Sequence, residues 1–180
     1  MVGGIAANNA SGMCCGTAQN SYHTLAGVRV VLVDGTVLDS RDAASRAEFA
    51  RARPDLVEGL AELARRTRED APLAARIRHK FRLKNTTGYS LNALVDFDDP
   101  IDVLAHLMIG SEGTLGFISE ISYRTVEEHA HKASALVLFD HLETACSAVT
   151  RLKSTPVAAV ELLDRASLRS VEAKPGMPEA

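Results

Sequence analysis

Two glycine-rich stretches contain the residues of this chain that are best suited to bind a ligand. The later one, GSEGTLGFISE over residues 110–120, combines glycines with a serine, a threonine and a carboxylate before it becomes strand-like. The earlier one, VGGIAANNASG over residues 2–12, is rich in small and amide side chains. Glycine has no Cβ and reaches positive φ freely, so such stretches let the backbone approach a ligand closely. The pair predicts contact with a flat or phosphorylated group.

A pyrophosphate suits this pattern, because backbone N–H groups in such turns form a concave set of donors for phosphate oxygens. Neither stretch is a Walker loop, since no Gly-Lys-Ser/Thr follows. Neither is the G-x-G-x-x-G dinucleotide fingerprint, because the glycines of GSEGTLG are spaced differently and precede a strand instead of a helix. An uncommon nucleotide-binding fold is left, with a pair of ordinary tight turns as the alternative.

The composition excludes several other classes of protein. With 180 residues, 46% of them hydrophobic, the chain is long enough to bury a core. The net charge of −3 is too small to indicate a nucleic-acid partner. No apolar run is long enough to predict a membrane span, and no secretory signal is visible. The three cysteines, two of them adjacent, do not form a disulfide framework, so a cytoplasmic location is expected.

The elements that must position these stretches follow from periodicity and turn chemistry. Up to Val126 we first predict a loop over 2–20, a hairpin over 25–38 around Asp34-Gly35, and helices from Asp42 and Pro54. We then predict a loop that ends in a short helical turn over 85–94, a helix from Asp99 to Ile109 and a strand over 117–125. Beyond it we predict strands over 131–139 and 156–163 that alternate with helices over 141–152 and from Asp164. This change of rhythm places a domain boundary near Glu127.

Four motifs in this order, GGIAANNASG, AGVRVVLVDGTVL, KNTTGYSL and GSEGTLGFISE, resemble a known family. They are similar to the FAD-binding domain of the vanillyl-alcohol oxidase / p-cresol methylhydroxylase (PCMH) superfamily. Within it, the match is to D-2-hydroxyacid dehydrogenases, closest to the bacterial flavin and iron–sulfur D-2-hydroxyglutarate or D-lactate dehydrogenases. The resemblance implies an α+β fold. Residues 1–126 would be the second half of a PCMH-type FAD-binding domain, with a mixed or antiparallel sheet and flanking helices, and residues 127–180 the start of a ferredoxin-like cap domain.

The resemblance also assigns cofactor-binding residues. In the first stretch, the residues expected to line the flavin are Gly4, Ala7, Asn9, Ala10 and Gly12. In the second, the residues expected to surround the pyrophosphate, ribose and adenine end are Glu112, Gly113, Gly116 and Ile118. Ser11 stands where many relatives have glycine, and Asn8 where many have threonine.

Some parts of the family pattern are missing from this sequence. The Gly-rich phosphate loop that precedes this region in the superfamily, the C-terminal His and Glu residues around the substrate, and the cysteine-rich iron–sulfur region are absent. We therefore expect the chain to be a piece of a longer protein. Its catalytic base would lie outside these residues, no metal site is expected within them, and an iron–sulfur cluster could belong only to the longer parent protein.

The implied reaction is oxidation of a small 2-hydroxyacid to the 2-oxoacid. A base takes the hydroxyl proton while hydride passes from C2 to flavin N5, and an electron acceptor that the sequence does not identify reoxidises the flavin. The alternative is a truncated, inactive chain that binds FAD weakly or needs a partner chain. A weaker alternative is another reaction on the same fold, such as aldonolactone oxidation or the reductase step of cell-wall precursor synthesis.

Several other residues have both a functional and a structural interpretation. Cys14 and Cys15 could be redox-active or tether the flavin, but buried packing beside the ring is the stronger expectation. His129 and His131 could ligate a metal, although solvated linker residues are more typical of a domain junction. The alternating cations of residues 76–84 could face a dicarboxylate substrate or an electron acceptor, or form a solvated edge strand. The loop that contains Asn85 and Tyr89 is expected to face the active site.

Overall fold

The chain divides into two units, Met1–Glu127 and Glu128–Ala180. The computed structural model describes residues 2–12, 14–152, 154–172 and 175. The first unit combines helices with a small antiparallel sheet, and the second contributes two helices, so the predicted α+β class is confirmed.

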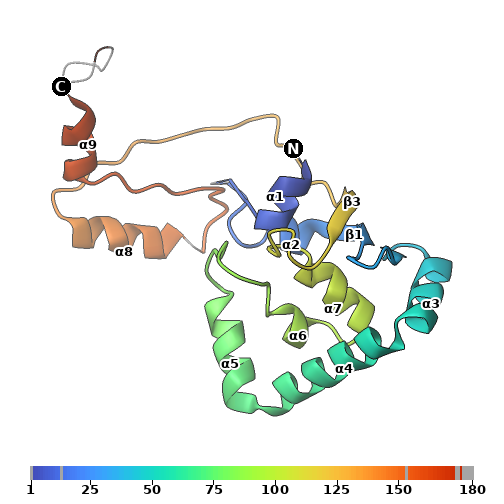
Figure 1. Ribbon diagram of the computed structural model, residues 1–180. Coiled ribbons are helices and arrows are strands. Elements are labelled where there is room, and N and C mark those ends of the chain that lie inside the picture. The colour runs from blue at the N-terminus through green and yellow to red at the C-terminus, as the bar shows by residue number, and fades with distance from the viewer. Residues whose placement is uncertain (1, 13, 153, 173–174, 176–180) are drawn as a thin grey trace. The chain divides into compact units, whose positions relative to one another are not determined.

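Most of the elements belong to the first unit (Figure 1). Its helices are α1 (Val2–Asn8), α2 (Ser21–Thr24), α3 (Ala43–Ala52), α4 (Pro54–Glu69), α5 (Ala71–Lys80), α6 (Ala93–Asp96) and α7 (Pro100–Leu107). Its strands are β1 (Leu25–Val31), β2 (Val37–Asp39) and β3 (Phe117–Tyr123). The second unit contains α8 (Leu142–Leu152) and α9 (Arg165–Glu172). The helix starts predicted at Asp42, Pro54, Asp99 and Asp164 are confirmed to within a residue.

The sheet has the order β2-β1-β3, and both pairs are antiparallel. The predicted hairpin is confirmed, with Val31 opposite Val37 and Gly35 at φ +84° in the turn. β3 pairs with the whole of β1, from Leu25 opposite Tyr123 to Val31 opposite Phe117. The hairpin motif and the strand that follows GSEGTLG are therefore hydrogen-bonded neighbours.

One arginine crosses the central strand and links the two outer ones. Arg41 donates to the carboxylate of Asp39 at 2.8 Å, to Glu120 at 3.3 Å and to the Ser122 hydroxyl at 2.7 Å. Its side chain passes over Gly27, where an added Cβ would overlap the Arg41 Cγ atom. Hydrogen bonding to Arg41 lowers the pKa of Asp39 to about 2. Glycine at residue 27 thus leaves room for the Arg41 side chain to cross the sheet and pair with carboxylates on both outer strands.

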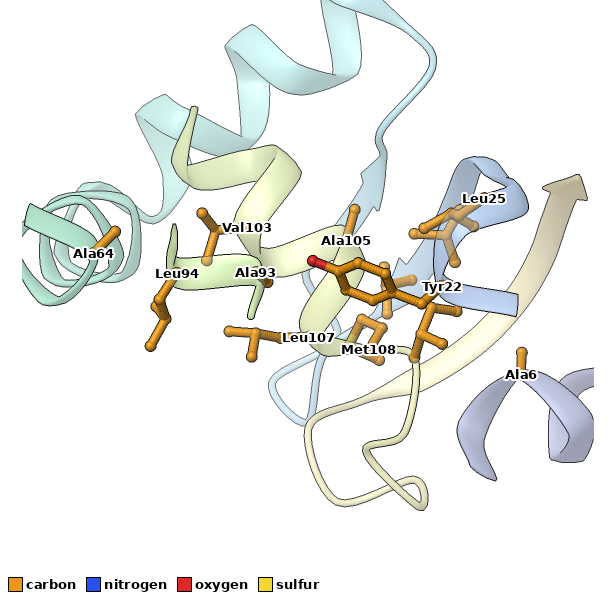
Figure 2. Close-up of a cluster of buried hydrophobic side chains, with 13 residues drawn as sticks. Ala6, Tyr22, Leu25, Ala64, Ala93, Leu94, Val103, Ala105, Leu107 and Met108 are labelled. Atoms are coloured by element: carbon orange, nitrogen blue, oxygen red, sulfur yellow. The ribbon is translucent and has the colours of Figure 1, made fainter. Parts of the chain in front are cut away.

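The core lies between the sheet and the helices, and α4 packs against both α6 and α7 (Figure 1). Figure 2 shows its main cluster, which extends from Ala64 of α4 through Met108 at the end of α7 and Tyr22 of α2 to Ala6 of α1. A second cluster forms around Phe49 of α3, which is 1% exposed. Residues far apart in sequence thereby fix the positions of both glycine-rich stretches.

The prediction of a continuous loop over residues 2–20 was wrong, because Val2–Asn8 forms α1. Gly3 and Gly4 each disfavour a helix by about 1 kcal/mol relative to alanine, and a helix this short is marginal alone. Tertiary contacts outweigh these costs. Ala6 is fully buried in the main cluster, and its carbonyl accepts a hydrogen bond from the Gly110 N–H at 3.2 Å.

The interpretation of the basic run as an edge strand was also wrong, because α5 extends to Lys80. The Asp70 side chain caps this helix by accepting from the Leu73 N–H at 3.0 Å. Ala74 and Ile77, three residues apart, form its buried face. The cations of the last turn are favourable there, since they lie at the negative end of the helix dipole. Asp70 and Pro72 are the start signals that reveal the helix in the sequence.

The second unit forms the two predicted helices but not the two predicted strands. Residues 131–139 and 156–163, all described in the structure, contain no strand. Leu136 and Leu138 are 84% and 83% exposed. A strand needs a hydrogen-bonded neighbour as well as a suitable sequence, and the described residues of this unit supply none.

Two aromatic rings contact one partly buried histidine of the first unit. His106 stacks on Phe97 with ring centroids 3.9 Å apart and meets the edge of Tyr22 at 5.0 Å. The Tyr22 hydroxyl donates to Asp96 at 2.8 Å. Burial, reinforced by the Asp96 carboxylate, raises the pKa of Tyr22 above its ordinary range.

We expect His106 to make the first unit less stable in mild acid. Burial lowers the pKa of its imidazole and Arg124 acts in the same direction, although Asp102 and Asp96 partly oppose them. The unfolded chain, with a histidine pKa of about 6.5, therefore binds this proton more tightly, so stability is lost as the pH falls below that value. Urea unfolding at about pH 7.5 and about pH 5.5 measures the loss. His106→Phe should reduce the pH dependence; an unchanged dependence would contradict the assignment.

Candidate functional site

The two glycine-rich stretches lie side by side and are joined by their backbones. The first segment (residues 2–12) accepts hydrogen bonds from the second segment (residues 110–116). The Glu112 N–H donates to the Ala7 carbonyl at 2.9 Å, next to the bond between Gly110 and Ala6. The Asn8 side-chain amide also donates to the Glu112 carboxylate at 2.6 Å. The sequence predicted two walls of one site, and the structure brings them into contact.

The backbone of these segments contains a concentration of left-handed residues. Asn9 and Glu112 have φ values of 54° and 53°, and Gly110 and Gly113 have values of 86° and 75°. Asparagine tolerates this region through local hydrogen bonding, and the Asn9 side chain accepts from the Tyr22 N–H at 3.2 Å. Glutamate has no such preference. Sparsely populated backbone conformations persist where the surrounding structure holds them, commonly at ligand sites.

A third segment, the bridging loop (residues 84–90), is tied to both. Lys84 Nζ donates to the Ser11 carbonyl at 2.5 Å, and the Ser90 hydroxyl donates to the Ile109 carbonyl at 2.6 Å. The Tyr89 hydroxyl lies 2.8 Å from the Thr114 hydroxyl. The KNTTGYSL motif is therefore part of the same assembly as the two glycine-rich motifs.

All three segments meet at Gly110. A Cβ atom there would lie 3.3 Å from Ser90 Oγ, 3.5 Å from the Gly88 carbonyl oxygen and 3.7 Å from Asn9 Cβ. This position combines positive φ with close packing, so only glycine satisfies both requirements.

The nine predicted cofactor residues occupy different surroundings. Gly4 and Gly113 face open space, with no atom within 4 Å of an added Cβ. Gly116 is crowded, since a Cβ there would lie 3.0 Å from the Val31 carbonyl oxygen. Ile118 pairs with Val30 in the sheet and packs on the core. The remaining five belong to the two segments, and among them Ala7 and Glu112 are bonded to each other; they are Ala7, Asn9, Ala10, Gly12 and Glu112.

Two buried hydroxyl groups at this junction have no hydrogen-bond partner in the described structure. They are Ser11 Oγ in the first segment and Ser111 Oγ in the second, and Ser111 is 1% exposed. Leaving a buried hydroxyl unpaired is costly, so such groups usually satisfy a ligand or water. One unpaired hydroxyl on each segment, together with the open space at Gly113 in the second segment, suits a cofactor with phosphate and hydroxyl groups. The residues present therefore fit FAD.

The remaining candidates fall outside this junction or on its rim. Cys14 is exposed, which corrects the expectation that both adjacent cysteines are buried. The neighbouring Cys15 thiol donates to the Gly12 carbonyl at 3.0 Å, so local turn geometry directs these side chains. Asn85 lines a space of about 10 Å³ beside Asn9. Among the described residues, no three His, Cys, Asp or Glu side chains cluster to hold a metal ion.

Sequence reasoning missed the pairing of Asn8 with Glu112 and the contact of Lys84 with Ser11. No local pattern signals either one, because each joins residues far apart in the chain.

Within the described residues, each helix is too short or too polar to cross a membrane.

Comparison with known proteins gives matches to two parts of the chain. Residues 1–41 match the family described as FAD binding domain, and residues 128–180 match FAD linked oxidases, C-terminal domain. The chain is 33% identical over 79 residues to glycolate oxidase subunit GlcD of Bacillus subtilis, covering 42% of the chain and 17% of that protein. It is 37% identical over 70 residues to the mitochondrial D-lactate dehydrogenase (cytochrome) of Arabidopsis thaliana, covering 38% and 12%. No solved structure matches.

The two matched models describe domains of FAD-linked oxidases, so this chain is similar to parts of FAD-linked oxidoreductases. These partial matches are consistent with the PCMH-type FAD oxidase superfamily that the sequence motifs predicted, and they support FAD as the cofactor. It spans less than a fifth of the length of the curated relatives it matches.

Proposed function

We propose that this chain is part of an FAD-dependent D-2-hydroxyacid dehydrogenase that converts D-lactate, D-2-hydroxyglutarate or a similar acid to the 2-oxoacid. The relatives named for glycolate and D-lactate support this substrate class. The observation that carries the proposal is the junction of the two glycine-rich segments, with one unpaired buried hydroxyl on each. We also infer that residues 1–126 belong to the FAD-binding domain and residues 127–180 to the cap domain.

Each part of the junction has a task in this proposal. The open backbone at Gly4 and Gly113 lets the cofactor approach. The Ser11 and Ser111 hydroxyls donate to its polar groups, and the Asn8–Glu112 bond holds the two walls together. When bound, FAD supplies the acceptor for the hydride of the substrate. A cytoplasmic location stays a prediction, in keeping with the free thiols of the cysteines.

The test is a fluorescence titration of the chain with FAD, followed by anaerobic addition of D-lactate or D-2-hydroxyglutarate to the complex. We expect saturable, stoichiometric FAD binding. When the catalytic residues are present, as in a longer form, we expect only the D-isomer to bleach the visible flavin band. The L-isomers serve as controls. Failure of the chain to bind FAD, together with binding after a longer form or a partner chain is supplied, would favour the alternative of a chain that holds FAD only weakly by itself.

A further inference from the structure

We propose that Lys84 forms an oxyanion subsite with the Ser11 turn, which deepens the proposed function and rests on it for the identity of the ligand. Lys84 ends the basic run of the sequence and begins the bridging loop. Its ammonium group reaches across to the first glycine-rich segment, where it donates to the Ser11 carbonyl at 2.5 Å. A single cation is therefore held directly beside the predicted cofactor wall.

The position of Lys84 is fixed by the loop that carries it. Further along this loop, Ser90 is bonded to the Ile109 carbonyl at 2.6 Å, and Tyr89 contacts Thr114 at 2.8 Å. Gly88 has a φ of 76°, and its carbonyl packs where Gly110 lacks a side chain. These contacts hold the loop against both glycine-rich segments, and the Lys84–Ser11 bond closes its other end.

The charge of Lys84 is not compensated within the described residues. An ammonium group has three donors, and the Ser11 carbonyl occupies one. No described carboxylate lies within ion-pair distance of Lys84, and the same is true of Lys80, so the contact with Ser11 is what distinguishes Lys84 within the basic run. Beside the Lys84 contact, the buried Ser11 hydroxyl has no described partner. Cationic and hydroxyl donors at one turn suit an oxygen anion.

Two ligands of the proposed enzyme carry such an anion: the FAD pyrophosphate and the substrate carboxylate. Both would accept hydrogen bonds from an ammonium group and a serine hydroxyl, so the subsite chemistry is the same. Riboflavin, which lacks phosphate, and oxalate, which has carboxylates but no flavin, separate the two sources.

The experiment compares the intact chain with Lys84→Met, Lys84→Arg and the matched control Lys80→Met. Lys80 belongs to the same basic run and lies exposed on the last turn of α5. Titrations with FAD and riboflavin are followed by fluorescence, and those with inorganic pyrophosphate and oxalate by thermal shift. Loss of one charge-assisted contact should weaken the dependent ligand about tenfold or more. Lys84→Arg should restore much of the affinity, and Lys80→Met should change nothing.

Each outcome decides the matter. Weaker FAD and pyrophosphate binding with unchanged riboflavin binding would assign the subsite to the pyrophosphate. Weaker oxalate binding alone would assign it to the substrate carboxylate. If Lys84→Met binds all four ligands as the wild-type chain does, or Lys80→Met loses as much, the subsite is overturned. If pyrophosphate or oxalate binding depends on Lys84 while the wild-type chain never binds FAD, the subsite stands and the proposed function fails.

Discussion

Replacing Gly110 with alanine is expected to lower the free energy of unfolding of the first unit by about 2–4 kcal/mol and to abolish FAD retention. The φ of 86° strains any side-chain residue. The new Cβ would also press on Ser90 Oγ at 3.3 Å, which cannot move freely because it is bonded to the Ile109 carbonyl. Urea unfolding and flavin content after purification measure the two effects.

Gly35→Ala is the matched control for this substitution. Gly35 has nearly the same φ, 84°, but no atom lies within 4 Å of an added Cβ. The Gly35→Ala variant should therefore lose only the free energy of unfolding that backbone strain costs, about 1–2 kcal/mol, and should keep FAD binding. Equal losses in the two variants would mean that the junction at Gly110 is not closely packed, contrary to the structure.

Replacing Gly113 with valine is expected to weaken FAD binding by at least about tenfold. Gly113 faces open space in the second segment, so a side chain there would occupy the volume that we assign to the cofactor. A β-branched residue at a φ of 75° also strains the turn. Fluorescence titration with FAD measures the combined effect.

A second substitution distinguishes a role of Gly113 in the turn from a role in cofactor binding. Asparagine tolerates positive φ, so Gly113→Asn should fold almost normally but still obstruct FAD. Gly35→Asn, in the hairpin turn, makes the same chemical change away from the site. If Gly113→Asn retains full FAD affinity while Gly113→Val loses stability, then this glycine serves only the turn, and its assignment to the cofactor is wrong.

Local signals were sufficient for most of the first unit. Asp34-Gly35 marked the hairpin, and Asp42, Pro54 and Asp99 marked helix starts, because caps and turns depend on neighbouring residues. α1 could not be predicted in this way. Its glycines oppose a helix, and only burial of Ala6 and bonding to the second segment stabilise it.

The same distinction applies to the site. The motifs of the two segments predicted a shared ligand, but nothing in either predicts that Asn8 contacts Glu112 or that Lys84 contacts Ser11. In the second unit, residues 131–139 and 156–163 have strand-like sequence without a described neighbour to pair with. Sequence patterns therefore specify elements well where the partner is near in the chain and poorly where it is distant.

The meeting of three segments at Gly110 also limits when FAD can bind during synthesis of the chain. The residues concerned are separated by most of the first unit, so no ribosome-bound chain can assemble the junction before residues 110–116 have emerged. Non-local contacts of this kind form late, after long loops have closed. Cofactor loading should therefore follow translation of the second segment, and nascent chains stalled within the bridging loop should remain free of flavin however much FAD is supplied.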